Sequence, residues 1–424
     1  MSDSNQRETP GAIPAAEVTP PLPSSAPGCM PWASFPWGGL PGFSSTGWGP
    51  EGNTVGRLAT EPPALVQSPP GFDAWFVRRQ FPMMEEKVEG KRVVWLDNAT
   101  TTQKPRTVID RLTRFYEHEH GLPARAAAAV ESAREAVRRL LNAGVAKEIR
   151  FVSGTAEGVR AIAYAWATAL APGDEVLADE GEHFSCWQAV AATCGAKLTV
   201  LPRNADGAVR VDEFRKLVST RTRIVALTHV TSASGTLAPV ELLTSIARGA
   251  HARVLIDGAH AVAHVPVDVQ AIGCDAYVVS GPHAFGPTGS GAVFCADAAA
   301  DEGLAADAVS LGAAADWLRS VGMKNVAAFE RQLLFHAARR LAEVPGATLL
   351  HGAAEPIAIL PVAIADAPAA EVVLSLSREG VFTSVAAGCL RVAAAVYNSR
   401  EDIDAFIDAL KARKPARLRL VPAG

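Results

Sequence analysis

The stretch RVLIDGAHAVAHVPVDVQAIGCDAYVVS, residues 253–280, decides the fold class. It holds two short apolar runs, and a polar residue ends each of them, Asp257 in the first and Ser280 in the second. Similar runs recur on both sides of it, namely IRFV at 149–152, EVLAD at 175–179, KLTVLP at 197–202, RIVALTHV at 223–230 and GAVFC at 291–295. Helix-like segments separate several of these runs. This alternation predicts an α/β fold with a mostly parallel, seven-stranded sheet between helices.

A second, smaller unit follows after about residue 300. Its hydrophobic periodicity predicts a long helix at 326–344, a strand at 356–364, a helix at 370–380 and a closing helix at 401–413. The sequence therefore predicts a large α/β domain at 71–300 and a small C-terminal α+β domain at 301–424.

Residues 1–70 differ in composition from the rest of the chain. They hold 14 of the 29 prolines together with many glycines and serines, which is typical of a disordered arm. The arm nevertheless carries aromatic residues in the stretch MPWASFPW, with Trp32, Phe35 and Trp37. Aromatic side chains are costly to expose unless something covers them. Two interpretations stay open: the arm lies on its own globular domain, or it docks to another protein.

The composition argues against several classes of protein. The chain has 424 residues, 49% of them hydrophobic, and a net charge of −4 without a basic block, so a large core is expected and nucleic-acid binding is not. The six cysteines are scattered without zinc-site spacing. The first residues lack the pattern of a secretory signal, and no apolar run is long enough to span a membrane. We therefore expect a soluble, cytoplasmic protein with no metal site.

Polar residues follow several of the predicted strands, at the edge where ligands bind in open α/β sheets. Asp257 follows a buried apolar run, where a desolvated carboxylate favours a cationic partner; the alternative is a capping role. Thr155 opens the helix after the strand at 149–152, where free amides form either an anion-binding site or an ordinary helix cap. His183 and His260 also follow strands, although a lone histidine is more often structural than functional.

Taken together, these motifs resemble a known family. The order of WLDNATTTQKP, FVSGTAEG, EGEHFSCW, THVTSASGT, LIDGAHAVAHVPVDV, YVVSGPHAFGPTG and LRVAAAVYNSREDID is similar to that of the cysteine desulfurases, and the resemblance spans residues 72–413. These proteins belong to the class V aminotransferase group of fold-type I enzymes, which use pyridoxal phosphate. The resemblance therefore implies the fold-type I architecture, a homodimer and a pyridoxal phosphate site.

The resemblance also implies roles for single residues. The cofactor phosphate would lie at Thr155 and the amides around it, with Ser280 as a second contact. His183 would stack on the pyridine ring, and Asp257 would pair with the ring nitrogen. Arg391 would bind the carboxylate of the substrate.

The chain departs from the family pattern at its reacting groups. His283 stands where the family has the lysine that bonds covalently to the cofactor, and imidazole has no primary amine. His260 replaces a glutamine in the cofactor site, and a glycine-rich segment that helps complete the neighbouring subunit's site is missing after the GPTG turn. Cys389 lies just before Arg391 in a shortened segment. We expect this cysteine in a strand, as a small buried side chain, rather than on a sulfur-accepting loop.

These losses leave no residue with a confident catalytic role and favour a pseudoenzyme that acts through a partner in sulfur metabolism. The partner would be a second copy, an active paralogue or a protein compartment, since the arm is similar in style to those of desulfurases packaged in encapsulin shells. Pyridoxal phosphate would bind non-covalently or not at all. Two alternatives remain: a pyridoxal phosphate enzyme that works without a covalent lysine–cofactor bond, and a site for another phosphorylated ligand at Thr155.

Overall fold

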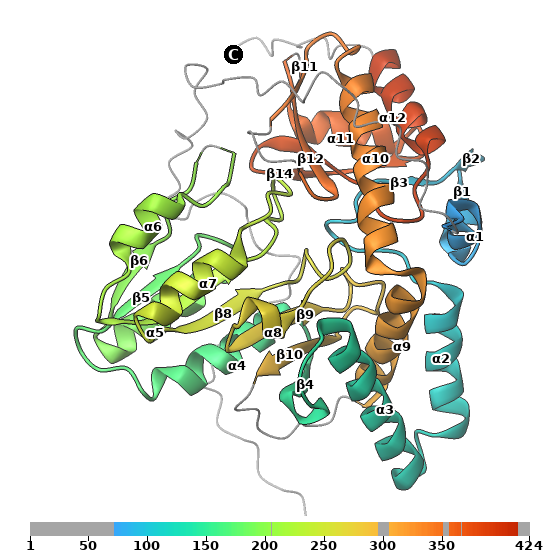
Figure 1. Ribbon diagram of the computed structural model, residues 1–424. Helices are drawn as coiled ribbons and strands as arrows, with labels where there is room; N and C mark the ends of the chain where they lie inside the picture. Colours follow the sequence, from blue (N-terminus) through green and yellow to red (C-terminus); the bar gives the residue numbers. More distant parts are fainter. Residues whose placement is uncertain (1–71, 205, 296–304, 351–355, 366, 414–424) are drawn as a thin grey trace, which may run out of the picture. The chain divides into compact units, whose positions relative to one another are not determined.

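The structure is a computed structural model, and it describes residues 72–204, 206–295, 305–350, 356–365 and 367–413 (Figure 1). The predicted arm at 1–70 lies outside the described residues, so both interpretations of it stay predictions. Among the described ranges, no helix is both long and apolar enough to cross a membrane.

The largest sheet has seven strands (Figure 1). Their spatial order is β4 (Ile149–Val152), β10 (Gly291–Cys295), β9 (Ala276–Ser280), β8 (Arg253–Asp257), β7 (Thr222–Thr228), β5 (Glu175–Ala178) and β6 (Lys197–Val200). β10 is antiparallel to both of its neighbours, and the other pairs are parallel. The seven runs predicted as strands therefore form one mostly parallel sheet, which confirms the predicted fold class.

Helices cover both faces of this sheet because successive strand residues point to opposite faces. In β8, Leu255 belongs to one apolar cluster, and its neighbours Val254 and Ile256 belong to another. The first cluster contains α4 (Thr155–Ala167) and α5 (Phe184–Cys194). The second contains α3 (Pro123–Leu141), α6 (Val211–Leu217), α7 (Val240–Gly249), α8 (Val269–Ile272) and α9 (Ala305–Val321).

α9 packs closely on α3, and a glycine makes this possible. A Cβ atom at Gly312 would lie 2.5 Å from Ala133, which is closer than real contacts allow.

Several short elements and one longer helix precede β4 in the chain. They are α1 (Ala74–Arg78), η2 (Pro82–Glu85), β1 (Lys87–Val88), β2 (Lys91–Arg92), α2 (Arg106–His118) and η3 (Ala146–Glu148).

The C-terminal part contains a four-stranded antiparallel sheet in the order β11 (Ala347–Leu349), β12 (Ile359–Ile364), β15 (Cys389–Ala393) and β14 (Ser384–Ala386). It shares one apolar core with α10 (Met323–Leu341), α11 (Ala369–Ser377) and α12 (Arg400–Ala412). β3 (Val94–Trp95) comes from the N-terminal side of the chain and pairs in parallel with β13 (Val381–Phe382) of this part. The helices and the strand predicted in this part are therefore present, with ends shifted by a few residues.

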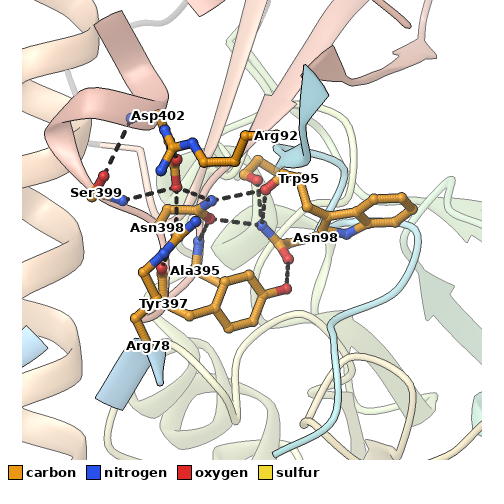
Figure 2. Close-up of polar contacts among 10 residues, drawn as sticks. Arg78, Arg92, Trp95, Asn98, Ala395, Tyr397, Asn398, Ser399 and Asp402 are labelled. Carbon is orange, nitrogen blue, oxygen red and sulfur yellow. Dashed lines mark hydrogen bonds and ion pairs between the residues drawn. The ribbon is translucent and has the colours of Figure 1, made fainter. Parts of the chain in front are cut away.

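A buried polar network joins α1 to α12 (Figure 2). The carboxylate of Asp402 is fully buried, and its oxygens lie 2.7 Å from Arg78 Nη1 and 2.8 Å from Arg92 Nη2. Asn398 Nδ2 donates to the same carboxylate at 3.2 Å, and Asn398 Oδ1 accepts from Asn98 Nδ2 at 3.1 Å. A buried charge needs partners of this kind. The network fixes Asn98 in the segment that follows β3.

Candidate functional site

Asp257 and His183 lie together at the carboxyl end of the large sheet. Asp257 is the last residue of β8, and its Oδ1 accepts a hydrogen bond from the Ala259 amide at 3.0 Å. His183 is the cap residue of α5, and its Nε2 lies 3.7 Å from Asp257 Oδ2. Burial raises the pKa of the Asp257 carboxyl above its ordinary value, and the Ala259 amide and His183 oppose this rise. One carboxylate oxygen therefore faces an imidazole and suits a cationic partner.

The start of α4 leaves backbone amides available to a ligand. Gly154 precedes the helix with φ of 150° and ψ of −176°, a conformation that is essentially restricted to glycine. Thr155 is the first helical residue, and across the described ranges neither its amide nor that of Ala156 has an acceptor. Glu157 turns back and accepts from Ser153 N at 2.5 Å and from Ser153 Oγ at 2.6 Å. The free amides and the helix dipole favour an anion beside Thr155.

His283 is held through both of its ring nitrogens. Nε2 lies 3.1 Å from the carbonyl oxygen of Ala99, and Nδ1 lies 3.0 Å from Ser280 Oγ. Because a carbonyl only accepts, Nε2 carries the hydrogen, and Nδ1 accepts the hydroxyl hydrogen of Ser280. Burial lowers the pKa of His283 to about 4, so the ring is neutral at neutral pH. The hydroxyl hydrogen of Ser280 is therefore committed to His283 and not free for a phosphate.

The register of the sheet brings Ser280 close to the start of α4. Gly291 of β10 pairs with Ser280 on one side and with Val152 on the other. A Cβ atom at Gly291 would lie 2.9 Å from the Gly154 Cα, so only glycine permits this approach. The anion position beside Thr155 and the His283–Ser280 pair therefore belong to one site.

His260 packs against His283. The two ring centroids are 4.2 Å apart, and the ring planes meet at 45°. His260 is 8% exposed, and burial together with the neighbouring His283 holds its pKa well below the ordinary value, so this ring is also neutral. Two neutral imidazoles thus occupy the positions where the resemblance places a glutamine and a lysine.

Arg391, in β15, is held by the protein itself. Its Nε donates to Ser384 Oγ at 2.9 Å, and its Nη2 donates to Thr100 Oγ1 at 2.7 Å. Its Nη1 donates to the carbonyl oxygen of Ser232 at 3.2 Å. Burial lowers the pKa of Arg391, whereas Asp97, 3.7 Å away, raises it. Each guanidinium nitrogen has a protein acceptor, so a substrate carboxylate would compete with these contacts.

Cys389 is the first residue of β15, in a strand as predicted. It pairs with Ala386 across a two-residue turn, in which Ala387 and Gly388 have φ values of 49° and 77°. Two positive φ values in succession are typical of a type I′ hairpin turn. The side chain is half-buried, so the prediction of a buried cysteine was wrong in this respect, because the strand lies at the edge of the tight turn. Burial raises the pKa of its thiol.

Sequence reasoning missed two titratable groups near these residues. Glu330 Oε2 lies 2.9 Å from His264 Nδ1, both side chains are buried, and burial raises the pKa of Glu330. The sequence signal that could have indicated Glu330 was the position of an acidic residue on the apolar side of α10. The amine of Lys104 donates to the Thr101 hydroxyl at 3.1 Å, and burial lowers its pKa to about 8. In the part of the chain that the structure describes, no group of side chains is arranged to hold a metal ion.

Comparison with known proteins gives the family. The model of the aminotransferase class-V family matches residues 94–304 and 303–406. A cysteine desulfurase of Synechococcus elongatus is 36% identical over 407 residues, which cover 82% of this chain and 65% of the relative. A cysteine desulfurase of Salmonella agona is 32% identical over 392 residues, which cover 79% of this chain and 96% of the relative.

The solved structures agree with this assignment. The crystal structure of a cysteine desulfurase from Escherichia coli matches with a TM-score of 0.72 and 27% identity, over 80% of this chain and 98% of that chain. The chain spans 65% of the length of the longer relatives from Synechococcus elongatus and Mycobacterium leprae. From its fold, its strand-end residues and these matches, the chain belongs to the class-V aminotransferase family and, within it, to the pyridoxal phosphate-dependent cysteine desulfurase family.

Proposed function

We propose that this chain is a non-catalytic member of the cysteine desulfurase family, which has lost the cofactor-binding lysine and the cysteine loop and acts by binding a partner. The observation that carries the proposal is the state of His283. Its ring is neutral at neutral pH, and both ring nitrogens are engaged, one by Ala99 and one by Ser280. A covalent bond to the aldehyde of pyridoxal phosphate needs a primary amine, which histidine lacks.

Part of the pocket still fits pyridoxal phosphate. Asp257 would pair with the ring nitrogen, His183 would stack on the ring, and the free amides beside Thr155 would bind the phosphate. The bound group would supply an electron sink for reactions at a substrate carbon. The covalent anchor does not fit, and the Ser280 hydroxyl donates to His283 instead. We therefore propose that any binding of pyridoxal phosphate here is non-covalent.

The residues expected to transfer sulfur support the same proposal. A nucleophilic cysteine needs a lowered pKa and freedom to reach the substrate. Cys389 has a raised pKa and follows a two-residue turn in a paired strand. Arg391, expected to bind the substrate carboxylate, donates to Ser384 and Thr100 instead.

The kind of partner is part of the proposal and rests on the sequence. A homodimer, or a heterodimer with an active paralogue, would bring a second subunit to a site that lacks the glycine-rich segment. The aromatic residues Trp32, Phe35 and Trp37 would dock to a partner or to a shell protein. The chain would then act in the cytoplasm or inside a protein compartment.

The test compares this chain with an active desulfurase under the same conditions. Each protein is mixed with pyridoxal phosphate and divided: one portion is treated with borohydride to trap any lysine, and an untreated portion is assayed for sulfide release from cysteine. We expect a trapped lysine peptide and sulfide from the active enzyme and neither from this chain. The variant His283→Lys alone should also release no sulfide, because the turn before Cys389 stays short.

The outcomes separate the alternatives. Sulfide release without a trapped lysine would support an enzyme that works without a covalent lysine–cofactor bond. A lysine trapped in the wild-type chain, or sulfide release by His283→Lys, would overturn the proposal.

A further inference from the structure

His260 is a buried side chain with unused hydrogen-bonding capacity. It is 8% exposed, and throughout the described residues neither of its ring nitrogens has a hydrogen-bond partner. Neither nitrogen is among the polar atoms that are both enclosed and unpaired, so accessible space adjoins the ring. Buried polar side chains almost always have a partner, which is a protein group, a water or a ligand, and the described protein groups supply none to His260.

The neutral ring of His260 offers one donor and one acceptor nitrogen. It stays neutral because of burial and because His283, His264 and Arg391 disfavour a further positive charge. Next to it, His283 has no free nitrogen. The only unpaired acceptor on these two rings is therefore the unprotonated nitrogen of His260.

The chemistry around this acceptor suits a ligand that brings its own amine. Position 283 carries no lysine, so the pocket has lost one primary amine and its positive charge. The carboxylate of Asp257 remains at the end of β8, 3.7 Å from His183 Nε2. A primary ammonium group has three donors and no acceptor, which suits a neutral imidazole nitrogen. An aldehyde has no donor to offer at the same place.

We propose that this pocket binds the aminated form of the cofactor, pyridoxamine 5′-phosphate, in preference to the aldehyde form, with His260 as the acceptor for its ammonium group. The inference rests on the proposed function only in requiring that position 283 forms no covalent bond. The phosphate end would lie beside Thr155 and the ring nitrogen beside Asp257, as for the aldehyde. The side chain that distinguishes the amine from the aldehyde is therefore His260 alone.

The experiment measures the affinity of the full chain by calorimetric titration at neutral pH. The probes are pyridoxamine 5′-phosphate, pyridoxal 5′-phosphate, the alcohol pyridoxine 5′-phosphate and inorganic phosphate. We expect the amine to bind about tenfold more tightly than the alcohol or the aldehyde, as a hydrogen bond from a charged donor provides. Inorganic phosphate reports the phosphate end alone and should bind most weakly.

Variants assign the preference to one side chain. His260→Leu removes the acceptor and should reduce the amine preference to about onefold, as expected for a lost charged hydrogen bond. The control is His118→Leu, whose side chain is 64% exposed in α2 and should leave every affinity unchanged. Circular dichroism and thermal melting show whether each variant is folded.

Equal affinities of the wild-type chain for the amine and the alcohol would overturn the inference. An amine preference that persists in folded His260→Leu would also overturn it. If that variant does not fold, the wild-type comparison of the amine with the alcohol still decides. A lysine trapped by borohydride would instead contradict the proposed function, so the two failures are distinguishable.

Discussion

Replacing Asp257 with asparagine should separate ligand binding from stability. Burial raises the pKa of Asp257, so the folded chain holds this proton more tightly than the unfolded chain. The carboxyl group therefore costs the folded state free energy as the pH rises above the ordinary pKa of aspartate, and this cost disappears again in acid. Asparagine has no such proton and keeps an oxygen for the Ala259 amide. We expect Asp257→Asn to be at least as stable as the wild type at neutral pH.

The same substitution should weaken the binding of the cofactor. Asp257 Oδ2 faces His183 and is the carboxylate oxygen available to a ring nitrogen. A hydrogen bond to a charged group contributes about 1.5 to 3 kcal/mol, so the dissociation constant should rise by about ten- to 150-fold.

Two measurements on one preparation test both statements. Calorimetric titration with pyridoxal phosphate and pyridoxamine 5′-phosphate gives the affinity, and thermal melting at acid and neutral pH gives the stability. The matched control is Asp316→Asn, because Asp316 is a half-exposed acid on α9 that pairs with Arg139. An unchanged affinity in a protein that binds these ligands, together with a lower melting temperature at neutral pH, would refute the reasoning and leave Asp257 a structural residue.

Three other predictions concern the stability of the fold and the N-terminal residues 1–70. Arg78→Met should lower the urea midpoint, because breaking a buried ion pair such as Arg78–Asp402 costs about 3 to 5 kcal/mol, whereas Arg79→Met at an exposed position should not. The wild-type chain should lose stability as the pH falls from about 6.5 to about 4, because burial lowers the pKa of His283, and thermal melts of His283→Asn should show a smaller loss. Deleting residues 1–70 should leave the melting temperature almost unchanged but abolish association with the partner or shell. Replacing Trp32, Phe35 and Trp37 with Ala should reproduce that loss of association, and a truncated chain that unfolds would contradict the docking role of the arm.

The large sheet could be predicted because its strands contain short apolar runs separated by helix-like segments. Every residue of β9 and β10 is buried, so each reads as a continuous apolar run. The antiparallel direction of β10 follows from the short turn at 281–290, which leaves no room for a crossover helix. α9 has only a weak helical pattern in the sequence, because residues on most of its sides, from Ala308 to Leu318, are buried.

The sequence predicts which residues of the candidate site lie at the ends of strands, but not the contacts between them. Asp257 ends a strand, His183 and Thr155 each follow one, and parallel strands bring such residues to one edge. The hydrogen bonds of His283 could not be predicted, since its acceptor Ala99 is far away in the sequence. The same holds for Glu330, which comes from a helix of the C-terminal part.

The ion pair between Arg78 and Asp402 has a mechanical consequence. Arg78 is the last residue of α1, the first helix of the described residues. A tensile load on α1 would pass through the guanidinium to the carboxylate of Asp402 and be borne by α12. The same carboxylate is hydrogen-bonded to Asn398, which holds Asn98, one peptide bond away from the carbonyl group that positions His283.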